Sequence, residues 1–426
     1  MCSVIVAPKG TSDMLPGLAR KWQHLLGVAA RLFESYGYEP IDTPAFEATE
    51  LFVRGIGEAT DIVHKEMYTF TDKGGRSLTL RPEETAPVVR AYLQHNMGAA
   101  GQLVKLYYAG PMFRFERPQA GRSRQFWQIG IEALGSEEPS VDAESILLLM
   151  RYLQRLGLQQ LTLLVNSMGC IECRPAYRET LAAYLREHAA ELCKDCVRRL
   201  EMNPLRVFDC KNPECVAVMK NAPKISEYLC QGCEDHFGEV KTLLGEVGLD
   251  YEERATLVRG FDYYTKTTFE VQSPLLGAQN ALGGGGRYDG LAEMIGGART
   301  PGIGFALGAE RTMLAMEGEQ VAVPSKMQVH VYVANVDAGT KQTAFGLLSN
   351  LREQGISAET DYMGRSLKGQ MKQAGKRGVL FTVILGPEEL ARGECKVRNM
   401  ESGEETPVAL DSLALWLSQK IRQETI

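Results

Sequence analysis

The chain has 426 residues, of which 44% are hydrophobic and 23% are charged, and its formal net charge at pH 7 is −6. This is ordinary globular composition, sufficient for roughly two to four domains, and the acidic balance gives no general sign of nucleic-acid binding, although local basic patches can still bind phosphates. No apolar run approaches the roughly 18 residues of a membrane span, and no secretory signal is evident, so we expect a cytoplasmic protein without membrane association.

The first predicted element is a long amphipathic helix over residues 17–36, where apolar residues recur at helical spacing. Residues 104–116 and 125–134 follow as two predicted strands joined by the polar loop PQAGRSR. In the second strand, Gln128 and Glu132 share one face, whereas apolar residues occupy the other. This alternation predicts an antiparallel sheet that carries a few polar side chains on one face.

Residues 166–245 interrupt the strand pattern with mostly helical, polar sequence. Strand signals resume in LVRGFDYYTKTTFEV (257–271), and PGIGFALGAERTMLAM (301–316) predicts a strand that passes into a helix. Between them, a glycine-rich turn is predicted at LGGGGRYDG (282–290). This stretch lacks the Lys-Ser/Thr of a phosphate-binding P-loop, so its glycines favour either a tight turn or the close approach of a ligand.

Residues 321–326 have the character of a linker, and beyond them strands alternate with helices. This order predicts an α/β domain of about 100 residues with a largely parallel sheet. The predicted helix at 364–377 carries Lys368, Lys372 and Lys376 on one face, because they are spaced four residues apart. That face is either an ordinary solvated surface or a patch for a nucleic-acid backbone.

Two further stretches could carry chemistry. The charged residues around the loop after the first hairpin strand form either a solvated charged turn or a phosphate site. The second reading is possible because arginine forks fit phosphate oxygens. These residues are Arg114, Glu116, Arg117, Arg122 and Arg124. Arg259, within a predicted strand, requires an anionic partner, either a carboxylate or a ligand phosphate. No Ser-His-Asp or Cys-His arrangement is evident, so we do not expect nucleophilic catalysis by a side chain.

In this order, the stretches resemble one family, the histidyl-tRNA synthetases of bacterial type, which are class II aminoacyl-tRNA synthetases. The long helix with GYEPIDTPAFE is similar to motif 1, FRFERPQAGRSRQFWQ to motif 2 and GIGFALGAERTM to motif 3. These three motifs mark the class only. LRPEETAPVVRAY also matches the family, and LVRGFDYYTKTTFEV and GGGGRYDGL resemble its two histidine-specific motifs, which are far more discriminating.

The resemblance implies an α+β fold, in which an antiparallel six-stranded sheet is flanked by helices. The catalytic core would comprise residues 1–165 and 246–322, a mainly helical, cysteine-rich insertion residues 166–245, and an α/β anticodon-binding domain residues 327–426. It also implies a homodimer that uses ATP with Mg²⁺ to form histidyl-adenylate and then esterifies tRNA(His), releasing pyrophosphate and AMP. A rival is the non-catalytic paralogue that serves as regulatory subunit of ATP phosphoribosyltransferase, which lacks the anticodon domain. A class II synthetase for another amino acid is a second rival.

The resemblance also assigns roles to residues of this chain. For ATP, Arg114 and Arg259 match the catalytic arginines at the α-phosphate, Arg122 and Arg311 the ligands of the outer phosphates, Glu116 the acceptor for the adenine amino group, and Phe126 the ring beneath the base. For histidine, Glu83, Thr85 and Gln128 match acceptors for the ammonium group, Glu132 and Tyr264 partners of the imidazole, and Tyr263 and Tyr288 the pocket walls. For tRNA, we expect Arg117 and Gln119 at the acceptor end, and Lys368, Lys372 and Lys376 at the anticodon stem.

Eight of the ten cysteines lie in pairs between residues 170 and 233, within the expected insertion. By spacing, we expect one zinc site formed by Cys170, Cys173, Cys193 and Cys196, and a second formed by Cys210, Cys215, Cys230 and Cys233. The family does not generally need this cluster. Reduced core cysteines, or a redox or disulfide role, therefore remain alternatives to a structural metal.

Overall fold

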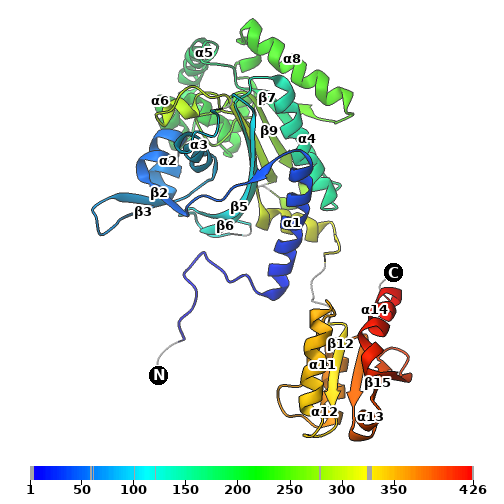
Figure 1. The fold of residues 1–426 in the computed structure, drawn as a ribbon. Helices are drawn as coiled ribbons and strands as arrows, with labels where there is room; N and C mark the ends of the chain where they lie inside the picture. Colours follow the sequence, from blue (N-terminus) through cyan, green and yellow to red (C-terminus); the bar gives the residue numbers. More distant parts are fainter. Residues whose placement is uncertain are drawn as a thin grey trace. The chain divides into compact units, whose positions relative to one another are not determined.

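The computed structural model describes residues 4–57, 60, 62–99, 101–119, 121–277, 280–323 and 329–424. The chain forms two compact units, Met1–Pro324 and Ser325–Ile426 (Figure 1). Among the described residues, no helix combines the length and the apolar character needed to cross a lipid bilayer.

An eight-stranded sheet lies at the centre of the first unit, in the order β1-β5-β6-β11-β10-β9-β7-β8. The six inner strands pair antiparallel, whereas the edge strands β1 and β8, each of two residues, pair in parallel. The expected six-stranded antiparallel sheet is confirmed, with a short strand added at each edge. The strands are β1 (Glu39–Pro40), β5 (Val104–Phe113), β6 (Gln125–Leu134), β7 (Thr162–Ser167), β8 (Glu252–Glu253), β9 (Thr265–Gln272), β10 (Ala281–Arg287) and β11 (Gly302–Gly308).

Four helices cover one face of this sheet and form the main core with it. They are α1 (Pro16–Ser35), α4 (Pro139–Arg155), α8 (Gln231–Glu246) and α10 (Ala309–Gly318), and Figure 1 shows α1 and α4 beside the strands. The sheet contributes the apolar residues of β6, including Ile129 and Ile131, so the predicted alternation in this strand is correct. The predicted helix at the N-terminus is likewise present, and its Trp22 ring lies 4.8 Å from that of Trp127.

A smaller three-stranded sheet, β2-β4-β3, packs with short helices near the other face. Its strands are β2 (Phe46–Ala48), β3 (Tyr68–Thr71) and β4 (Ser77–Leu80), and the helices are α2 (Thr49–Ile56), α3 (Thr85–Gln94) and α9 (Leu291–Met294). Helix α3 begins directly after the LRPEE stretch. Its first residue, Thr85, and Glu83 just before it therefore lie beside the central sheet.

Most of the glycine-rich stretch is a strand, β10, and the predicted turn is present only at its end, at residues 289–290. It pairs with β9 on one side and β11 on the other, and a Cβ added to Gly285 would lie 1.9 Å from the carbonyl oxygen of Gly304. A Cβ on Gly284 would lie 3.0 Å from Nη1 of Arg259. The glycines therefore leave room for neighbouring backbone and for this arginine. The close approach of a ligand to these glycines stays a prediction.

The predicted strand over residues 257–271 is wrong in its first half. Strand β9 begins only at Thr265, and residues 259–264 form bends and a turn. The physical reason is that the carbonyl oxygens of Arg259 and Gly260 accept hydrogen bonds from the Arg206 side chain, at 3.1 and 2.6 Å, and not from a neighbouring strand. We call residues 259–264 the arginine loop.

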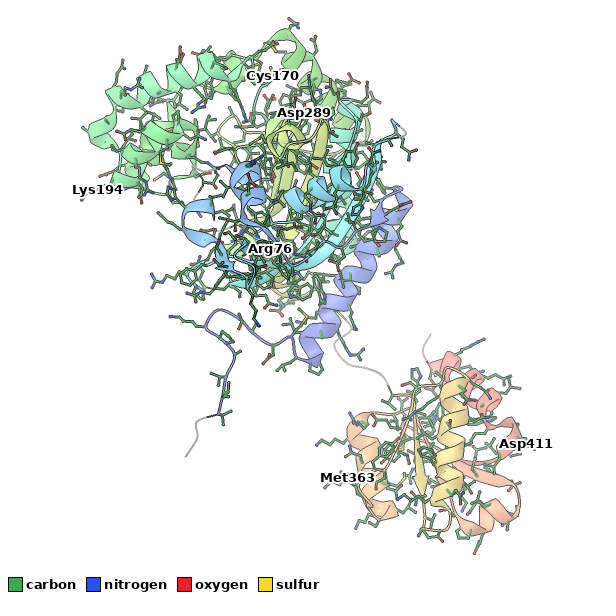
Figure 2. All side chains as sticks on the ribbon, turned by 60° about the vertical axis from the view of Figure 1, so that its left-hand side comes forward. Arg76, Cys170, Lys194, Asp289, Met363 and Asp411 are labelled. Atoms are coloured by element: carbon green, nitrogen blue, oxygen red, sulfur yellow. The ribbon has the colours of Figure 1, made fainter. Side chains whose placement is uncertain are left out.

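The expected insertion is mainly helical and has a core of its own, which includes Tyr177, Leu181 and Cys196. Its helices are α5 (Arg174–Glu187), α6 (Lys194–Met202), α7 (Pro213–Lys220) and α8, with a 3₁₀ helix, η3 (Pro204–Asp209), between α6 and α7. In Figure 2, Lys194 at the start of α6 lies far from Cys170 at the beginning of this helical segment.

The second unit contains a five-stranded sheet in the order β13-β12-β14-β15-β16 with helices between its strands. The expectation of parallel pairing is correct for β13, β12 and β14 and wrong for β15 and β16, which pair antiparallel. The connections to the last two strands are too short for a parallel crossover. The elements are β12 (Val331–Asn335), α11 (Lys341–Glu353), β13 (Ala358–Thr360), α12 (Leu367–Arg377), β14 (Phe381–Leu385), α13 (Pro387–Ala391), β15 (Glu394–Asn399), β16 (Glu405–Ala409) and α14 (Leu413–Glu424).

Candidate active site

A cavity of about 340 Å³ lies over the sheet face that carries Gln128, Gly304 and Ala306, opposite the main core. Twelve of the thirteen residues expected to bind histidine or ATP line it: Glu83, Thr85, Arg114, Glu116, Arg122, Phe126, Gln128, Arg259, Tyr263, Tyr264, Tyr288 and Arg311. They come from α3, the β5–β6 hairpin, the arginine loop, the end of β10 and the start of α10. The fold thus brings together residues separated by more than 200 positions in the sequence.

The thirteenth residue, Glu132, lies just behind the cavity wall and is fully buried. Its carboxylate accepts hydrogen bonds from the hydroxyl groups of Thr85 (2.7 Å), Tyr108 (3.3 Å) and Tyr288. Burial raises the pKa of Glu132 to about 8, against the opposing effect of these hydroxyl donors. All three donors line the cavity, so Glu132 is one hydroxyl group away from any ligand within it.

The acceptors expected for an ammonium group are present in the cavity. The carboxylate of Glu83 accepts the backbone N–H groups of Thr85 (2.7 Å) and Ala86 (2.9 Å) at the start of α3, and burial raises its pKa. The side-chain oxygen of Gln128 is buried and has no hydrogen-bond partner within the described part of the chain. An unpaired buried acceptor is costly unless a ligand donates to it, which is consistent with a binding role.

Two partly buried arginines line the same cavity. Arg114 donates from Nε to the carbonyl oxygen of Pro82 at 2.8 Å, its guanidinium lies 5.2 Å from the Phe126 ring centroid, and burial lowers its pKa. Arg259 donates to Glu270 at 2.6 Å; burial would lower its pKa, but Tyr264 and Glu270 raise it. Its Nε is buried without a partner among the described residues. Two fixed cations in one cavity suit a polyphosphate ligand.

The remaining charged residues of the cavity are held by local contacts. Arg122 pairs with Glu116 at 3.0 Å, and Arg311 donates to the carbonyl oxygen of Ala281 at 2.7 Å from the first turn of α10. The predicted passage from strand to helix within residues 301–316 is therefore correct.

Three buried tyrosines form an aromatic wall. The ring of Tyr263 lies 4.8 Å from that of Tyr264 and 5.8 Å from that of Tyr288. Together with Glu132, they could enclose a flat polar ring such as an imidazole.

Sequence reasoning missed two residues of the site, Tyr108 and Glu270. Tyr108 lines the cavity opposite Gly130, where an added Cβ would lie 2.4 Å from the tyrosine oxygen, so a glycine within the β6 pattern was a readable signal for a close approach. Glu270 holds Arg259, and the polar alternation of Thr268, Glu270 and Gln272 in β9 could have indicated it.

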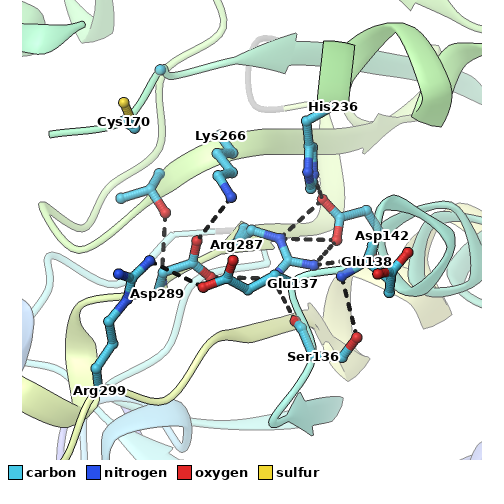
Figure 3. Close-up of polar contacts among 12 residues, drawn as sticks. Ser136, Glu137, Glu138, Asp142, Cys170, His236, Lys266, Arg287, Asp289 and Arg299 are labelled. Atoms are coloured by element: carbon cyan, nitrogen blue, oxygen red, sulfur yellow. Dashed lines mark hydrogen bonds and ion pairs between the residues drawn. The ribbon is translucent and has the colours of Figure 1, made fainter. Parts of the chain in front are cut away.

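A network of buried charges supports the end of β10 from behind (Figure 3). The side chain of Arg287 is fully buried; it donates to Asp142 through Nε at 3.0 Å and pairs with Asp289 at 3.1 Å. His236 of α8 contacts the other oxygen of Asp142 at 2.8 Å. Since Tyr288 lies between Arg287 and Asp289, this network fixes the tyrosine that donates to Glu132.

A second, larger cavity of about 620 Å³ shares Arg114, Glu116, Arg122 and Arg311 with the first and extends to the helical insertion. On that side, its lining is basic and includes Arg198, Arg199, Arg206, Lys211 and Arg254. A chain of phosphates could therefore continue from the first cavity into the second.

The residues expected to meet tRNA lie outside both cavities. Arg117 and Gln119 are exposed in the loop that joins β5 and β6. Lys368, Lys372 and Lys376 lie on the exposed face of α12, whereas Gln370 and Ala374 occupy its buried face.

The eight cysteines form two groups of four, but not the groups expected from spacing. The outer cluster consists of Cys170, Cys173, Cys230 and Cys233, and the inner cluster of Cys193, Cys196, Cys210 and Cys215. Within each, all four Sγ atoms lie within 4.8 Å of one another. The predicted pairing is wrong because the chain closes on itself: α8 returns to the start of the insertion and brings its last cysteine pair to its first, which leaves the two middle pairs to meet.

Comparisons with known proteins identify the family of this chain. A family model described as "Histidyl-tRNA synthetase" matches residues 10–312, and one described as "Anticodon binding domain" matches residues 328–420. The histidine–tRNA ligase of Halothermothrix orenii is 52% identical over 409 residues, covering 96% of this chain and 98% of that protein. That of Geobacillus kaustophilus is 49% identical over 420 residues, covering 98% of this chain and 99% of that protein.

Solved structures give the same grouping. Apo histidyl-tRNA synthetase from Staphylococcus aureus superposes with a TM-score of 0.83 at 39% identity, covering 97% of this chain and 100% of that chain. An ATP phosphoribosyltransferase regulatory subunit/histidyl-tRNA synthetase from Bacillus halodurans superposes with a TM-score of 0.63 at 20% identity, covering 88% of this chain and 97% of that chain. At that identity, the second similarity concerns the fold alone.

Proposed function

Because the chain belongs to the histidyl-tRNA synthetase family and is an enzyme that attaches L-histidine to tRNA, we propose that histidine and ATP meet in the 340 Å³ cavity. The observation that carries this proposal is the convergence of twelve expected substrate residues on that one cavity. The regulatory-subunit alternative is less supported, since an anticodon-binding model matches residues 328–420.

In the first step, the carboxylate of histidine attacks the α-phosphorus of ATP, and pyrophosphate leaves. Negative charge gathers on the α-phosphate oxygens in the transition state, and we assign its stabilisation to Arg114 and Arg259. Arg122 and Arg311 would hold the outer phosphates, Phe126 the adenine ring and Glu116 its amino group. The family uses Mg²⁺ with ATP, and Glu270, which lines the larger cavity beside Arg259, offers the oxygen ligands that this ion prefers.

Histidine would lie between the acidic and aromatic walls. Glu83, Thr85 and Gln128 accept its ammonium group. Tyr264 pairs with one imidazole nitrogen, Glu132 acts on the other through a hydroxyl group that donates to it, and Tyr263 and Tyr288 enclose the ring. An isosteric amino acid would leave these buried groups unpaired, so discrimination should be strong without editing. Histidine-dependent ATP–pyrophosphate exchange tests the assignment, and its absence with histidine present would refute it.

For tRNA(His), we propose that the acceptor end enters beside Arg117 and Gln119, and that the basic wall of the larger cavity receives its phosphates. We further propose that Lys368, Lys372 and Lys376 contact the anticodon stem. Replacing all three by glutamate should raise the KM for tRNA and leave pyrophosphate exchange unchanged. A matched triple reversal of the exposed Lys341, Lys420 and Arg422 serves as control, and equal effects of the two triples would contradict the proposal.

We propose a homodimer that works in the cytoplasm, with the core, insertion and anticodon domains divided at the boundaries expected from the sequence. The dimer is supported by the exposure of large apolar side chains before and within motif 1: Ile5 is 96% exposed, Val4 87% and Phe46 51%. Light scattering during size-exclusion chromatography measures the mass in solution, and a monomer at micromolar concentration would contradict the dimer.

We also propose that each cysteine cluster binds one zinc ion. Four sulfurs at about 2.3 Å from a tetrahedral zinc lie about 3.8 Å from one another, and the Cys170–Cys173 and Cys170–Cys230 sulfur distances are 3.5 and 3.8 Å. Backbone N–H groups of Cys230 and Cys193 donate to sulfurs of Cys173 and Cys215, at 3.1 and 3.2 Å. Zinc would stabilise the small core of the insertion.

Metal analysis of protein purified without chelator should find two zinc ions per chain, and Cys173→Ser should lower the content to one. Less than about one ion per wild-type chain would refute the assignment.

A further inference from the structure

The arginine loop depends on a side chain of the insertion. The guanidinium of Arg206 donates to the carbonyl oxygens of Arg259 and Gly260, at 3.1 and 2.6 Å, and to Oδ1 of Asp262 at 3.0 Å. Asn203 donates to the same oxygen of Asp262 at 3.0 Å. Four hydrogen bonds from one short segment thus hold the arginine loop, two through its backbone at Arg259 and Gly260 and two through the side chain of Asp262.

These contacts are partly shielded from water, because only 13% of the Arg206 side chain is exposed. Hydrogen bonds from a charged, mostly buried donor are stronger than neutral ones and restrict the accepting backbone. On its other side, Arg259 is held by Glu270 at 2.6 Å. The guanidinium of Arg259 is therefore fixed by Glu270 at its tip and by Arg206 at its base.

The segment that carries Arg206 is in turn connected to the inner cysteine cluster. It lies in η3, whose flanking residues are Asn203 at the N-terminal end and Cys210 at the C-terminal end. Cys196 belongs to α6, which leads into η3, and the sulfur of Cys210 lies 3.8 Å from that of Cys193. Both ends of the segment that carries Arg206 are consequently tied to this one cluster. None of the cysteines of the outer cluster flanks η3.

We propose that Arg206 is a positioning residue for Arg259, and that the inner cysteine cluster, when loaded with metal, holds Arg206 in place and thereby sets the rate of histidine activation. The inference rests on the proposed roles of Arg259 and of zinc. Its chemical consequence is specific: loss of the inner metal should act on the transition state at the α-phosphate, before any tRNA is bound.

The first experiment measures histidine-dependent pyrophosphate exchange in Arg206→Ala, Arg206→Lys and the control Arg186→Ala, which removes an exposed arginine of α5. Arg206→Ala should lower kcat on the order of 100-fold with little change in the KM for histidine, because a misplaced catalytic group costs about that much. Lysine should restore part of the rate, and Arg186→Ala should retain it.

A double-mutant cycle separates positioning from general damage. In an Arg259→Ala background, Arg206→Ala should change the remaining rate less than about 2-fold, because the group it positions is already gone. A second loss of full size in that background, or wild-type kcat in Arg206→Ala alone, would overturn the proposal.

The cluster is tested by readouts that do not require activity. Cys210→Ser should lose one zinc ion, and amide hydrogen exchange of residues 259–264 should accelerate in this variant as it does in Arg206→Ala, but not in Arg186→Ala. Unchanged protection of the arginine loop in Cys210→Ser after metal loss would overturn the link to the cluster. Absence of zinc from the wild type would refute the metal assignment separately, and absence of exchange activity in the wild type would refute the proposed function separately.

Discussion

Replacing Glu132 by glutamine should stabilise the unliganded protein relative to the wild type as the pH rises from 5 to 8. Glu132 is fully buried, faces the acidic Glu83 and the hydroxyls of Thr85, Tyr108 and Tyr288, and has its pKa raised from 4.5 to about 8. A carboxyl group with a raised folded-state pKa supports folding below its unfolded-state pKa. That support is lost as the pH rises toward the folded-state pKa, because Glu132 ionises at a lower pH in the unfolded chain than in the folded one.

The size of the effect follows from the two pKa values. With about 1.36 kcal/mol for each pKa unit, the wild-type penalty grows from about 1 kcal/mol at pH 5 to about 4 kcal/mol at pH 8. Glutamine does not titrate, and the hydrogen bonds it loses cost a similar amount at every pH. The difference in stability between variant and wild type should therefore shift by about 3 kcal/mol in favour of the variant, or about 6 °C in melting temperature at about 2 °C per kcal/mol.

Differential scanning calorimetry of the ligand-free chain at pH 5, 6, 7 and 8 measures this shift, with the exposed Glu293→Gln as control. The same variant should bind histidine more weakly, raising its KM about 2- to 10-fold, because it alters the acceptor of the hydroxyl groups that face the imidazole and a neutral hydrogen bond contributes about 0.5–1.5 kcal/mol. A difference in melting temperature that stays constant over this pH range would refute the argument that Glu132 is destabilised by burial.

Three further outcomes are expected. Arg259→Ala should lower kcat for pyrophosphate exchange on the order of 10²- to 10³-fold with little effect on the KM for histidine, and a rise in KM alone would argue against a transition-state role. Tyr264→Phe should raise the KM for histidine about 10-fold in exchange assays and leave that for ATP unchanged, whereas an effect on ATP alone would contradict its imidazole role. Asp142→Ala leaves Arg287 without its main buried partner, so it should lower the free energy of unfolding by about 3–5 kcal/mol, and a loss below about 1 kcal/mol by thermal unfolding would count against the network in Figure 3.

Elements whose burial follows a regular period were predictable from the sequence. The helix α1 and the alternating strand β6 agree with the structure because each places one apolar face on a common core, so spacing alone reveals them. The same alternation put Gln128 and Glu132 on one face, and the motifs supplied the remaining members of the cavity. The local pattern predicted the wrong structure where contacts from a distant segment replace the hydrogen bonds between strands. Residues 259–264 do not form a strand because Arg206 binds the carbonyl oxygens of Arg259 and Gly260.

The sequence by itself determined the family, the antiparallel sheet and twelve residues that line the cavity, since motifs and periods of two or 3.6 residues reveal them. Only the tertiary structure decided which cysteines meet and what supports Arg259. Cys170 and Cys230 are 60 positions apart and Arg206 and Arg259 are 53 apart, yet each pair is in contact. Such pairings depend on how α8 and η3 fold back on the core, and no local spacing encodes that path.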